Sequence, residues 1–255
     1  MGVYAIHDKR SIPPGQTAGA HDPLPQLIHN RQLLQAALLS LEVAVTASTV
    51  AVVLGTLAAI ALVRFAKFRG RLLLSGMVNA PLVMPEIITG ITQLLLFVSM
   101  LQMFAWPHRG FTTIVISHVV FCTAYATITI QSRLQSADRS LEEAAMDLGS
   151  GPARAFIEIT LPIIAPALLS SWLLNFTLSL DDLVISSFVS GPGASTLPMV
   201  IYSKVKLGVS PDINALASLI ICGVGACVIA AGYLMRRAER QRELEMHNAD
   251  HAPGG

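Results

Sequence analysis

Long uncharged stretches alternate with short charged segments along most of this chain. Four of these stretches contain no Asp, Glu, Lys or Arg: 43–63, 110–132, 159–180 and 213–235. A fifth, at 72–107, contains only Glu86. A membrane-spanning helix needs about 20 mostly apolar residues. The pattern therefore predicts five transmembrane helices, at about 38–63, 72–102, 111–131, 163–188 and 213–235.

The composition favours an all-α, polytopic membrane protein. Of the 255 residues, 53% are hydrophobic and 13% are charged, whereas soluble domains carry about 25% charged residues. The formal net charge of +1 suggests no nucleic-acid partner. The three cysteines lie in apolar runs without a C-x-x-C pair, which favours packing roles over a metal site or a disulfide.

Motifs typical of a membrane enzyme do not occur in the sequence. It contains no H-E-x-x-H, no G-x-S-x-G and no clustered histidines, and it has no G-x-x-x-x-G-K-[ST] loop for ATP phosphates. A transport subunit is therefore favoured over an enzyme. Any energy from ATP would come through another subunit, and no cofactor is expected in this chain.

The flanking segments predict how the chain lies in the membrane. Residues 1–37 are rich in Pro and Gly, which is typical of an irregular tail. Residues 38–235 are assigned to the transmembrane domain and 236–255 to a polar tail. Most of the 17 Lys and Arg residues follow the first, third and fifth predicted helices. Because cytoplasmic loops are enriched in Lys and Arg, these loops and the C-terminus are expected in the cytoplasm.

The loop at 133–162 is predicted to form a cytoplasmic helical hairpin. Ser140 and Glu143 match a capping box, which marks the start of a helix. Gly149 suits the left-handed residue that ends such a helix. Pro152 suits the first turn of a second short helix. Two short amphipathic helices joined by a glycine turn are suited to a groove on a soluble partner.

The hairpin also matches a longer motif. Pro162 is expected to end the second short helix where the fourth span begins. The string E-A-A-x3-G-x9-I-x-L-P is formed by Glu143, Ala144, Ala145, Gly149, Ile159, Leu161 and Pro162. It resembles the EAA loop of the membrane subunits of binding-protein-dependent ABC importers. The resemblance implies a MetI-like permease fold, in which these residues receive the motion of a separate ATPase.

A second stretch resembles the polyamine branch of that family, the spermidine and putrescine permeases. It is "FTLSLDDLVISSFVSGPGASTLPM", at 176–199. Shorter stretches favour the putrescine permeases, and they lie at 63–70, 80–90, 117–125 and 208–220. The resemblance covers about 36–245 and implies import of putrescine across the bacterial inner membrane, with spermidine as the alternative. The implied partners are a second homologous permease, a pair of ATPase subunits and a periplasmic polyamine-binding protein.

Acidic residues inside predicted spans are candidates for the substrate path, because a carboxylate within the membrane is unfavourable unless it has a function or a partner. Asp181 and Asp182 lie roughly 27 Å along the fourth span, near its outer end. They line the mouth of a cation path, form a polar hinge beside the gate or mark a solvated helix end. Glu86 pairs with an arginine, contacts substrate or is neutral. Tyr125 lies on one helix face with His118, and internal hydrogen bonding is favoured there over substrate contact.

The N-terminal region departs from the family pattern. Polyamine permeases have six spans, and the resemblance here begins near the second. A translation start assigned too late, a damaged gene or a true five-helix form would each explain this. A remnant that docks on an ATPase without conducting is the remaining alternative to a working permease.

Overall fold

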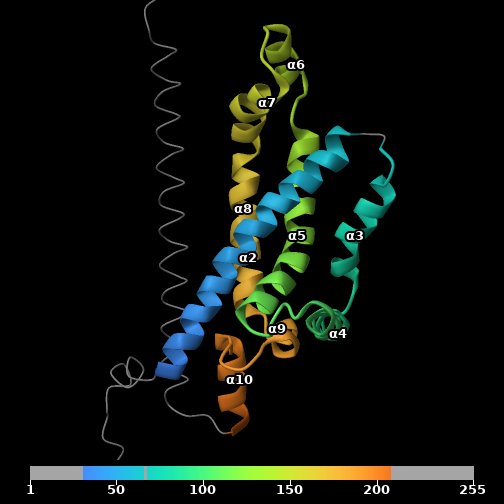
Figure 1. The fold of residues 1–255 in the computed structure, drawn as a ribbon. Helices are drawn as coiled ribbons and strands as arrows, with labels where there is room; N and C mark the ends of the chain where they lie inside the picture. Colours follow the sequence, from blue (N-terminus) through green and yellow to red (C-terminus); the bar gives the residue numbers. More distant parts are fainter. Residues whose placement is uncertain (1–30, 66–67, 208–255) are drawn as a thin grey trace, which may run out of the picture. The chain divides into compact units, whose positions relative to one another are not determined.

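The computed structural model describes residues 31–65 and 68–207, all within the compact unit Arg31–Gly208. These residues form helices and turns without a strand (Figure 1). The predicted helix at 213–235 lies outside them. The helices are α2 (Arg31–Arg64), α3 (Arg71–Val83), α4 (Glu86–Phe104), α5 (Phe111–Ser136), α6 (Ser140–Asp147), α7 (Pro152–Ala155), the π-helical turn η1 (Phe156–Thr160), α8 (Leu161–Asp181), α9 (Val184–Val189) and α10 (Leu197–Leu207).

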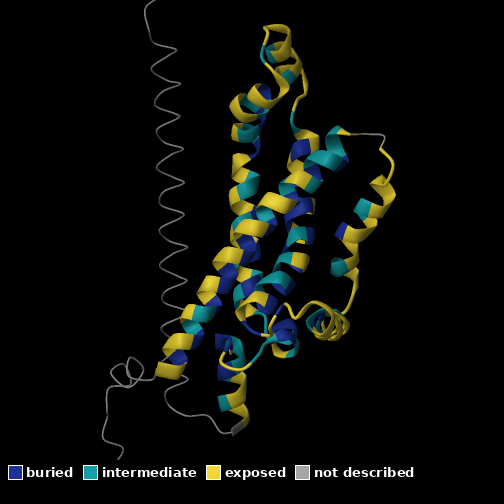
Figure 2. Ribbon diagram, in the orientation of Figure 1, coloured by how far each residue is buried: buried dark blue, intermediate teal, exposed yellow. Residues whose placement is uncertain are grey.

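Helices α2, α5 and α8 pack against one another and form the centre of the described unit. Figure 2 shows that buried residues concentrate on their facing sides, whereas α3 and α6 are largely exposed. The buried face of α2 is built from small residues, including Ala44, Ala47, Ser48, Ala51 and Ala59. Small side chains allow close approach of helix backbones, which is the usual basis of helix packing in membranes.

The first and third predicted helices are present and longer than expected. Helix α2 begins at Arg31, so residues 31–37 are helical and do not belong to the irregular tail assigned from the sequence. Leu33, Ala36 and Ser40 are buried on the face that continues into the span, and this helical spacing explains the earlier start. Helix α5 likewise continues to Ser136, beyond the expected end at 131.

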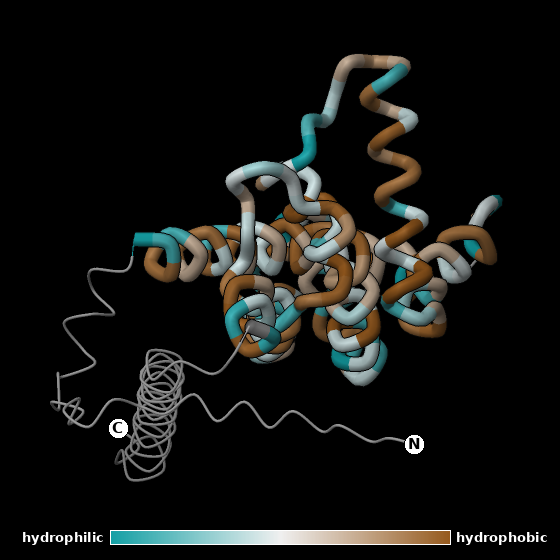
Figure 3. Tube along the Cα trace, turned by 90° about the horizontal axis from the view of Figure 1, so that it is seen from below, coloured by the Kyte–Doolittle hydropathy of each residue, from teal (hydrophilic) through white to brown (hydrophobic). Residues whose placement is uncertain are grey.

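The second predicted helix, at 72–102, is two helices. The chain leaves helical geometry at Met84, whose backbone is extended with φ −77° and ψ 136°. Proline disfavours helical geometry in the residue before it and has no N–H to donate, so Pro85 accounts for the break. Figure 1 shows α4 nearly end-on beside the lower end of α3, and Figure 3 shows this mainly hydrophobic helix along its length.

The fourth predicted helix, at 163–188, has different ends. Pro162 does not end the preceding helix, because α7, η1 and α8 run continuously from Pro152 to Asp181. The helix then stops at Asp182, whose ψ of 121° is extended, and α9 follows as a separate short helix. Helix α10 was not predicted, because an 11-residue helix is too short to form one of the long uncharged runs that mark a membrane span.

Four helical segments within the described residues are long and apolar enough to cross a membrane. They are Arg31–Arg64, Glu86–Phe104, Phe111–Ser136 and Pro152–Asp181. Together with the packing of α2, α5 and α8, they agree with the predicted all-α membrane fold.

Candidate functional site

A pocket of about 280 Å³ lies where the start of α4, the middle of α5 and the α8–α9 junction meet. It brings together all four residues named from the sequence as candidates for the substrate path: Glu86, Tyr125, Asp181 and Asp182. The last turn of α3 contributes Pro81, and the break after it contributes Met84. The interruptions in the second and fourth predicted helices therefore form this pocket.

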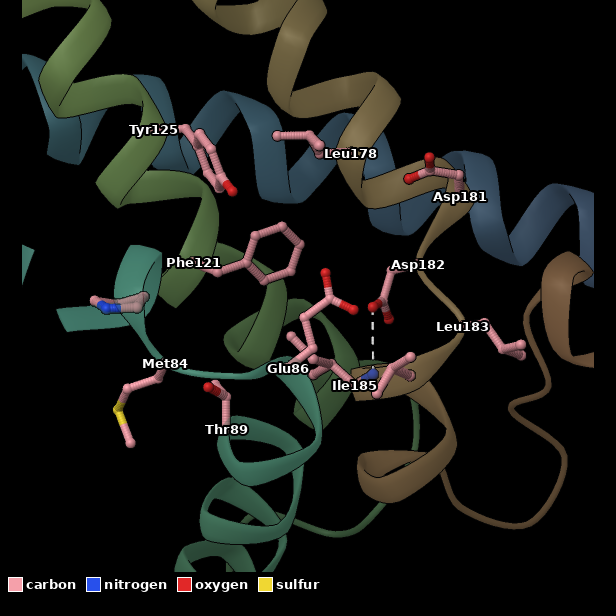
Figure 4. Close-up of a pocket in the computed structure, with 12 residues that line it drawn as sticks. Met84, Glu86, Thr89, Phe121, Tyr125, Leu178, Asp181, Asp182, Leu183 and Ile185 are labelled. Carbon is pink, nitrogen blue, oxygen red and sulfur yellow. Dashed lines mark hydrogen bonds between the residues drawn. The ribbon is translucent and has the colours of Figure 1, made fainter. Parts of the chain in front are cut away.

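The pocket has an acidic lining with an apolar floor. Three of its lining residues are carboxylic acids, and none of the lining residues is Lys or Arg. In Figure 4 the Glu86 and Asp182 carboxylates point toward the middle of the pocket, and the Tyr125 hydroxyl points toward it from α5. Phe121 and Leu178 supply apolar surface between them. Acidic groups beside apolar walls suit an organic cation with a short hydrocarbon chain.

The two adjacent aspartates have different environments. Asp181 is exposed, whereas the side chain of Asp182 is only 7% exposed. Asp182 accepts hydrogen bonds from the backbone N–H groups of Ile185 (3.2 Å) and Ser186 (2.8 Å). It therefore caps the first turn of α9 through its carboxylate.

His118 connects Asp182 to the rest of the bundle. Its ring is fully buried on α5. Its Nε2 lies 3.2 Å from Oδ2 of Asp182 and 3.0 Å from Oγ of Ser186. Its Nδ1 lies 2.6 Å from Oγ of Ser179 on α8. Internal hydrogen bonding of His118 was favoured from the sequence and is confirmed, but its partner Asp182 was not identified, because the two residues meet only in the tertiary structure.

The hairpin that carries the EAA motif is the second candidate site. Helix α6 ends at a Schellman motif, in which the N–H of Gly149 bonds to the Met146 carbonyl (2.9 Å) and the N–H of Ser150 bonds to the Ala145 carbonyl (3.0 Å). Gly149 has φ +91°, as its predicted left-handed role requires. Pro152 occupies the first turn of α7, as predicted.

The start of α6 differs from the prediction. No Ser140 side-chain cap is formed, so the predicted capping box is absent. The Ser140 backbone N–H instead donates to Oδ1 of Asp138 at 2.9 Å, and this bond lowers the pKa of the Asp138 carboxyl. An aspartate just before a helix satisfies one of the free N–H groups of the first turn.

The motif residues divide between an outer and an inner set. Glu143, Ala144 and Gly149 are exposed, as is Pro162 on α8. Ala145, Ile159 and Leu161 are partly buried, and Leu161 packs against the core around Ile164. The exposed set is therefore not covered by other parts of the described chain.

Residues 51–243 match the family described as "Binding-protein-dependent transport system inner membrane component". The chain belongs to this family. It is 55% identical over 225 residues to the putrescine transport system permease protein PotI of Escherichia coli (strain K12), covering 88% of this chain and 80% of PotI. It is 42% identical over 210 residues to the spermidine/putrescine transport system permease protein PotC of the same strain, covering 82% of this chain and 77% of PotC.

Solved structures of the same fold include other ABC importers. One is the inward-facing MetNI methionine ABC transporter, with a TM-score of 0.65 and 16% identity over 85% of this chain and 98% of that chain. Another is a bacterial ABC transporter involved in import of the acidic polysaccharide alginate, with a TM-score of 0.68 and 16% identity over 88% and 85% of the two chains. The likeness confirms the predicted MetI-like permease fold of this family.

Proposed function

We propose that this chain is a permease subunit of an ATP-driven importer that moves putrescine into the bacterial cytoplasm. The relatives support a polyamine as substrate, because PotI is named for putrescine and PotC for spermidine and putrescine. The identity is higher to the putrescine permease, at 55% against 42%. Spermidine is the second candidate substrate, supported by the likeness to PotC.

The acidic pocket carries this proposal. Alkylammonium groups remain protonated at neutral pH, with pKa values near 10, so a diamine carries two positive charges. When the diamine enters an apolar barrier, both ammonium groups lose hydrating water. A carboxylate about 4 Å from one ammonium group offsets roughly 4 kcal/mol of the lost hydration free energy at an effective dielectric constant near 20. Glu86 and Asp181 are exposed members of the pocket, and we assign them the contacts with the diamine.

The hairpin is proposed to couple this pocket to an ATPase. Helix α6 exposes apolar side chains despite its polar sequence: Leu141 is 50% exposed, Met146 41% and Leu148, at its end, 90%. Apolar side chains on a short exposed helix suit a groove on a soluble protein. Through this contact, movements of the ATPase pair would be transmitted to the transmembrane helices of this chain. A second homologous permease, a periplasmic polyamine-binding protein and the lipid bilayer complete the assembly.

Uptake of labelled putrescine tests the proposal. The chain and its partner subunits are expressed in a strain without its own polyamine permeases, and uptake is compared with that of Asp181→Asn and Glu86→Gln. Each variant keeps the side-chain size and removes one charge, so uptake is expected to fall severalfold. Glu42→Gln is the matched control, because Glu42 is an exposed acid on α2 outside the pocket.

The outcomes separate the alternatives. Strong competition by unlabelled spermidine, with spermidine uptake exceeding that of putrescine, would favour the second candidate substrate. Wild-type levels of uptake in both pocket variants would reject the assigned contacts. A wild-type chain that assembles with the ATPase and moves neither polyamine would identify a non-transporting remnant.

A further inference from the structure

Glu142, the residue before the EAA glutamate, links three elements of the bundle. Its carboxylate oxygen Oε1 accepts a hydrogen bond from Nη2 of Arg64, at the end of α2. The same oxygen accepts a hydrogen bond from the Thr160 hydroxyl, at the end of η1. The hairpin, α2 and the beginning of α8 therefore meet at one carboxylate.

This link is shielded from solvent. The side chains of Arg64 and Glu142 are 14% and 20% exposed, and Thr160 is 1% exposed. Exposed ion pairs contribute little, because solvent screens them and the side chains remain mobile. A shielded carboxylate with two donors is held more firmly, because hydrogen bonds to a charged group are stronger than neutral ones.

The neighbouring glutamates point to different roles. Helix α6 has no buried residue and packs mainly against α7 and η1, so few apolar contacts hold it to the bundle. Glu143 is exposed on this helix, and Glu142 is partly buried. Glu143 is thus available to a partner, whereas Glu142 is directed at the chain's own spans.

We propose that Glu142 is a positioning residue that transmits movement of the hairpin to α2 as well as to α8. Movement reaches α8 through the continuous chain of α7 and η1. Movement reaches α2 through the ion pair with Arg64. The π-helical turn lies at the junction, and such turns often occur at functional sites in helices. The inference rests on the proposed coupling role of the hairpin.

The first test measures how firmly the hairpin is held, without reference to substrate. Hydrogen exchange of the amides at 140–150 is followed in the assembled complex containing wild type, Glu142→Gln or Glu158→Gln. Glu142→Gln should speed exchange by roughly tenfold, because it weakens charge-assisted bonds. Glu158→Gln is the control and should leave exchange unchanged, because it removes only the exposed ion pair with Arg154. Equal exchange in wild type and Glu142→Gln would overturn the proposal.

The second test measures coupling in proteoliposomes as putrescine moved per ATP hydrolysed. Glu142→Gln and Arg64→Glu are expected to lower this ratio severalfold while ATP hydrolysis continues. Arg64→Glu combined with Glu142→Arg reverses the ion pair, and the Thr160 hydroxyl can then accept a hydrogen bond from the arginine in place of donating one to Glu142, so the double variant should recover the ratio. A reversed pair no better than either single variant would overturn the proposal.

The two tests keep the inference separate from the proposed function. If the wild-type complex moves no putrescine, the proposed function fails, and the exchange measurement still decides whether Glu142 holds the hairpin. If wild type transports and Glu142→Gln transports with an unchanged ratio, the coupling role of Glu142 fails and the proposed function stands.

Discussion

Asp181 and Asp182 show how adjacent identical side chains acquire different roles. Asp182 accepts two backbone hydrogen bonds from α9 and lies beside the buried His118. Asp181 is exposed at the pocket. A buried donor that loses its acceptor is destabilising by about 1–3 kcal/mol, whereas exposed substitutions usually change stability little. The pair therefore combines one structural and one accessible carboxylate.

We predict opposite behaviour for alanine at these two positions. Asp182→Ala should lower the free energy of unfolding by about 1–3 kcal/mol, because it leaves the amides of Ile185 and Ser186 without their acceptor and removes one partner of His118. Asp181→Ala should leave stability within about 0.5 kcal/mol while lowering putrescine uptake. Thermal unfolding of the purified complex measures the stability of the two variants, and labelled putrescine measures their uptake. A normal melting temperature for Asp182→Ala would show that α9 does not depend on this cap.

Gly149 provides a second prediction about a single residue. Its φ of +91° is unfavourable for most side chains, yet an added Cβ would meet nothing within 4 Å. Gly149→Val should therefore act through backbone strain of about 1 kcal/mol or more and lower both uptake and retention of the ATPase. Gly149→Asn is the matched control, because Asn tolerates left-handed geometry. Equal loss in both variants would indicate that side-chain bulk obstructs the partner, independently of strain.

The crossing of α2 and α5 leaves no room for a side chain at Gly55. A Cβ added at Gly55 would lie 2.6 Å from Cβ of Ala126 and 2.9 Å from the backbone nitrogen of Thr127. Neither atom moves without shifting a helix. Gly55→Ala should therefore destabilise the protein by about 1–3 kcal/mol through overpacking.

Gly76, in the exposed helix α3, is the control for this prediction. Nothing lies within 4 Å of an added Cβ there, and Ala is favoured over Gly in a helix by about 0.5–1 kcal/mol. Gly76→Ala should be neutral or stabilising. Thermal unfolding of the two purified complexes gives the comparison, and similar melting temperatures for both would contradict the close α2–α5 packing.

Helix type was predictable from sequence, and helix ends depended on particular residues. Uncharged runs of about 20 residues identified α2, α5 and α8 because the membrane imposes that length. Pro85 broke a helix, but Pro162 did not, because the wide π turn at 156–160 precedes it and accommodates its ring. The two prolines look alike in sequence, so only the local geometry distinguishes them.

The composition of the candidate pocket was predictable in part. Glu86, Asp181 and Asp182 stood out because carboxylates are rare in apolar spans, and the structure brings them into one pocket. The different roles of the two aspartates were not predictable from the sequence. It depends on His118, a tertiary partner 64 positions away from Asp182 that no local pattern marks.

The described unit has two ends with different sequences. At one end lie the end of α2, the start of α3 and the hairpin of α6 and α7 (Figure 1). The basic residues of the described chain at this end are Arg64, Arg69, Arg71, Arg133, Arg139 and Arg154. At the other end lie the start of α2, α9 and α10, with the basic residues Arg31, Arg109, Lys204 and Lys206. The hairpin end has six of these ten residues. Since Lys and Arg favour the cytoplasmic side, we predict that the hairpin end is cytoplasmic.

Reporter fusions test this orientation. A reporter active only outside the cytoplasm should work when fused after His108 or Ser195, which lie in the loops before α5 and α10. It should be inactive after Arg69, after Gly149 and at the C-terminus. A cytoplasmic reporter at the same positions should give the reverse pattern and controls for expression. Because an ATPase acts only from the cytoplasm, external activity at Gly149 would remove the hairpin from reach of its proposed partner. Activity at Gly149 would therefore reject the coupling role, even if the acidic pocket proved to carry diamines.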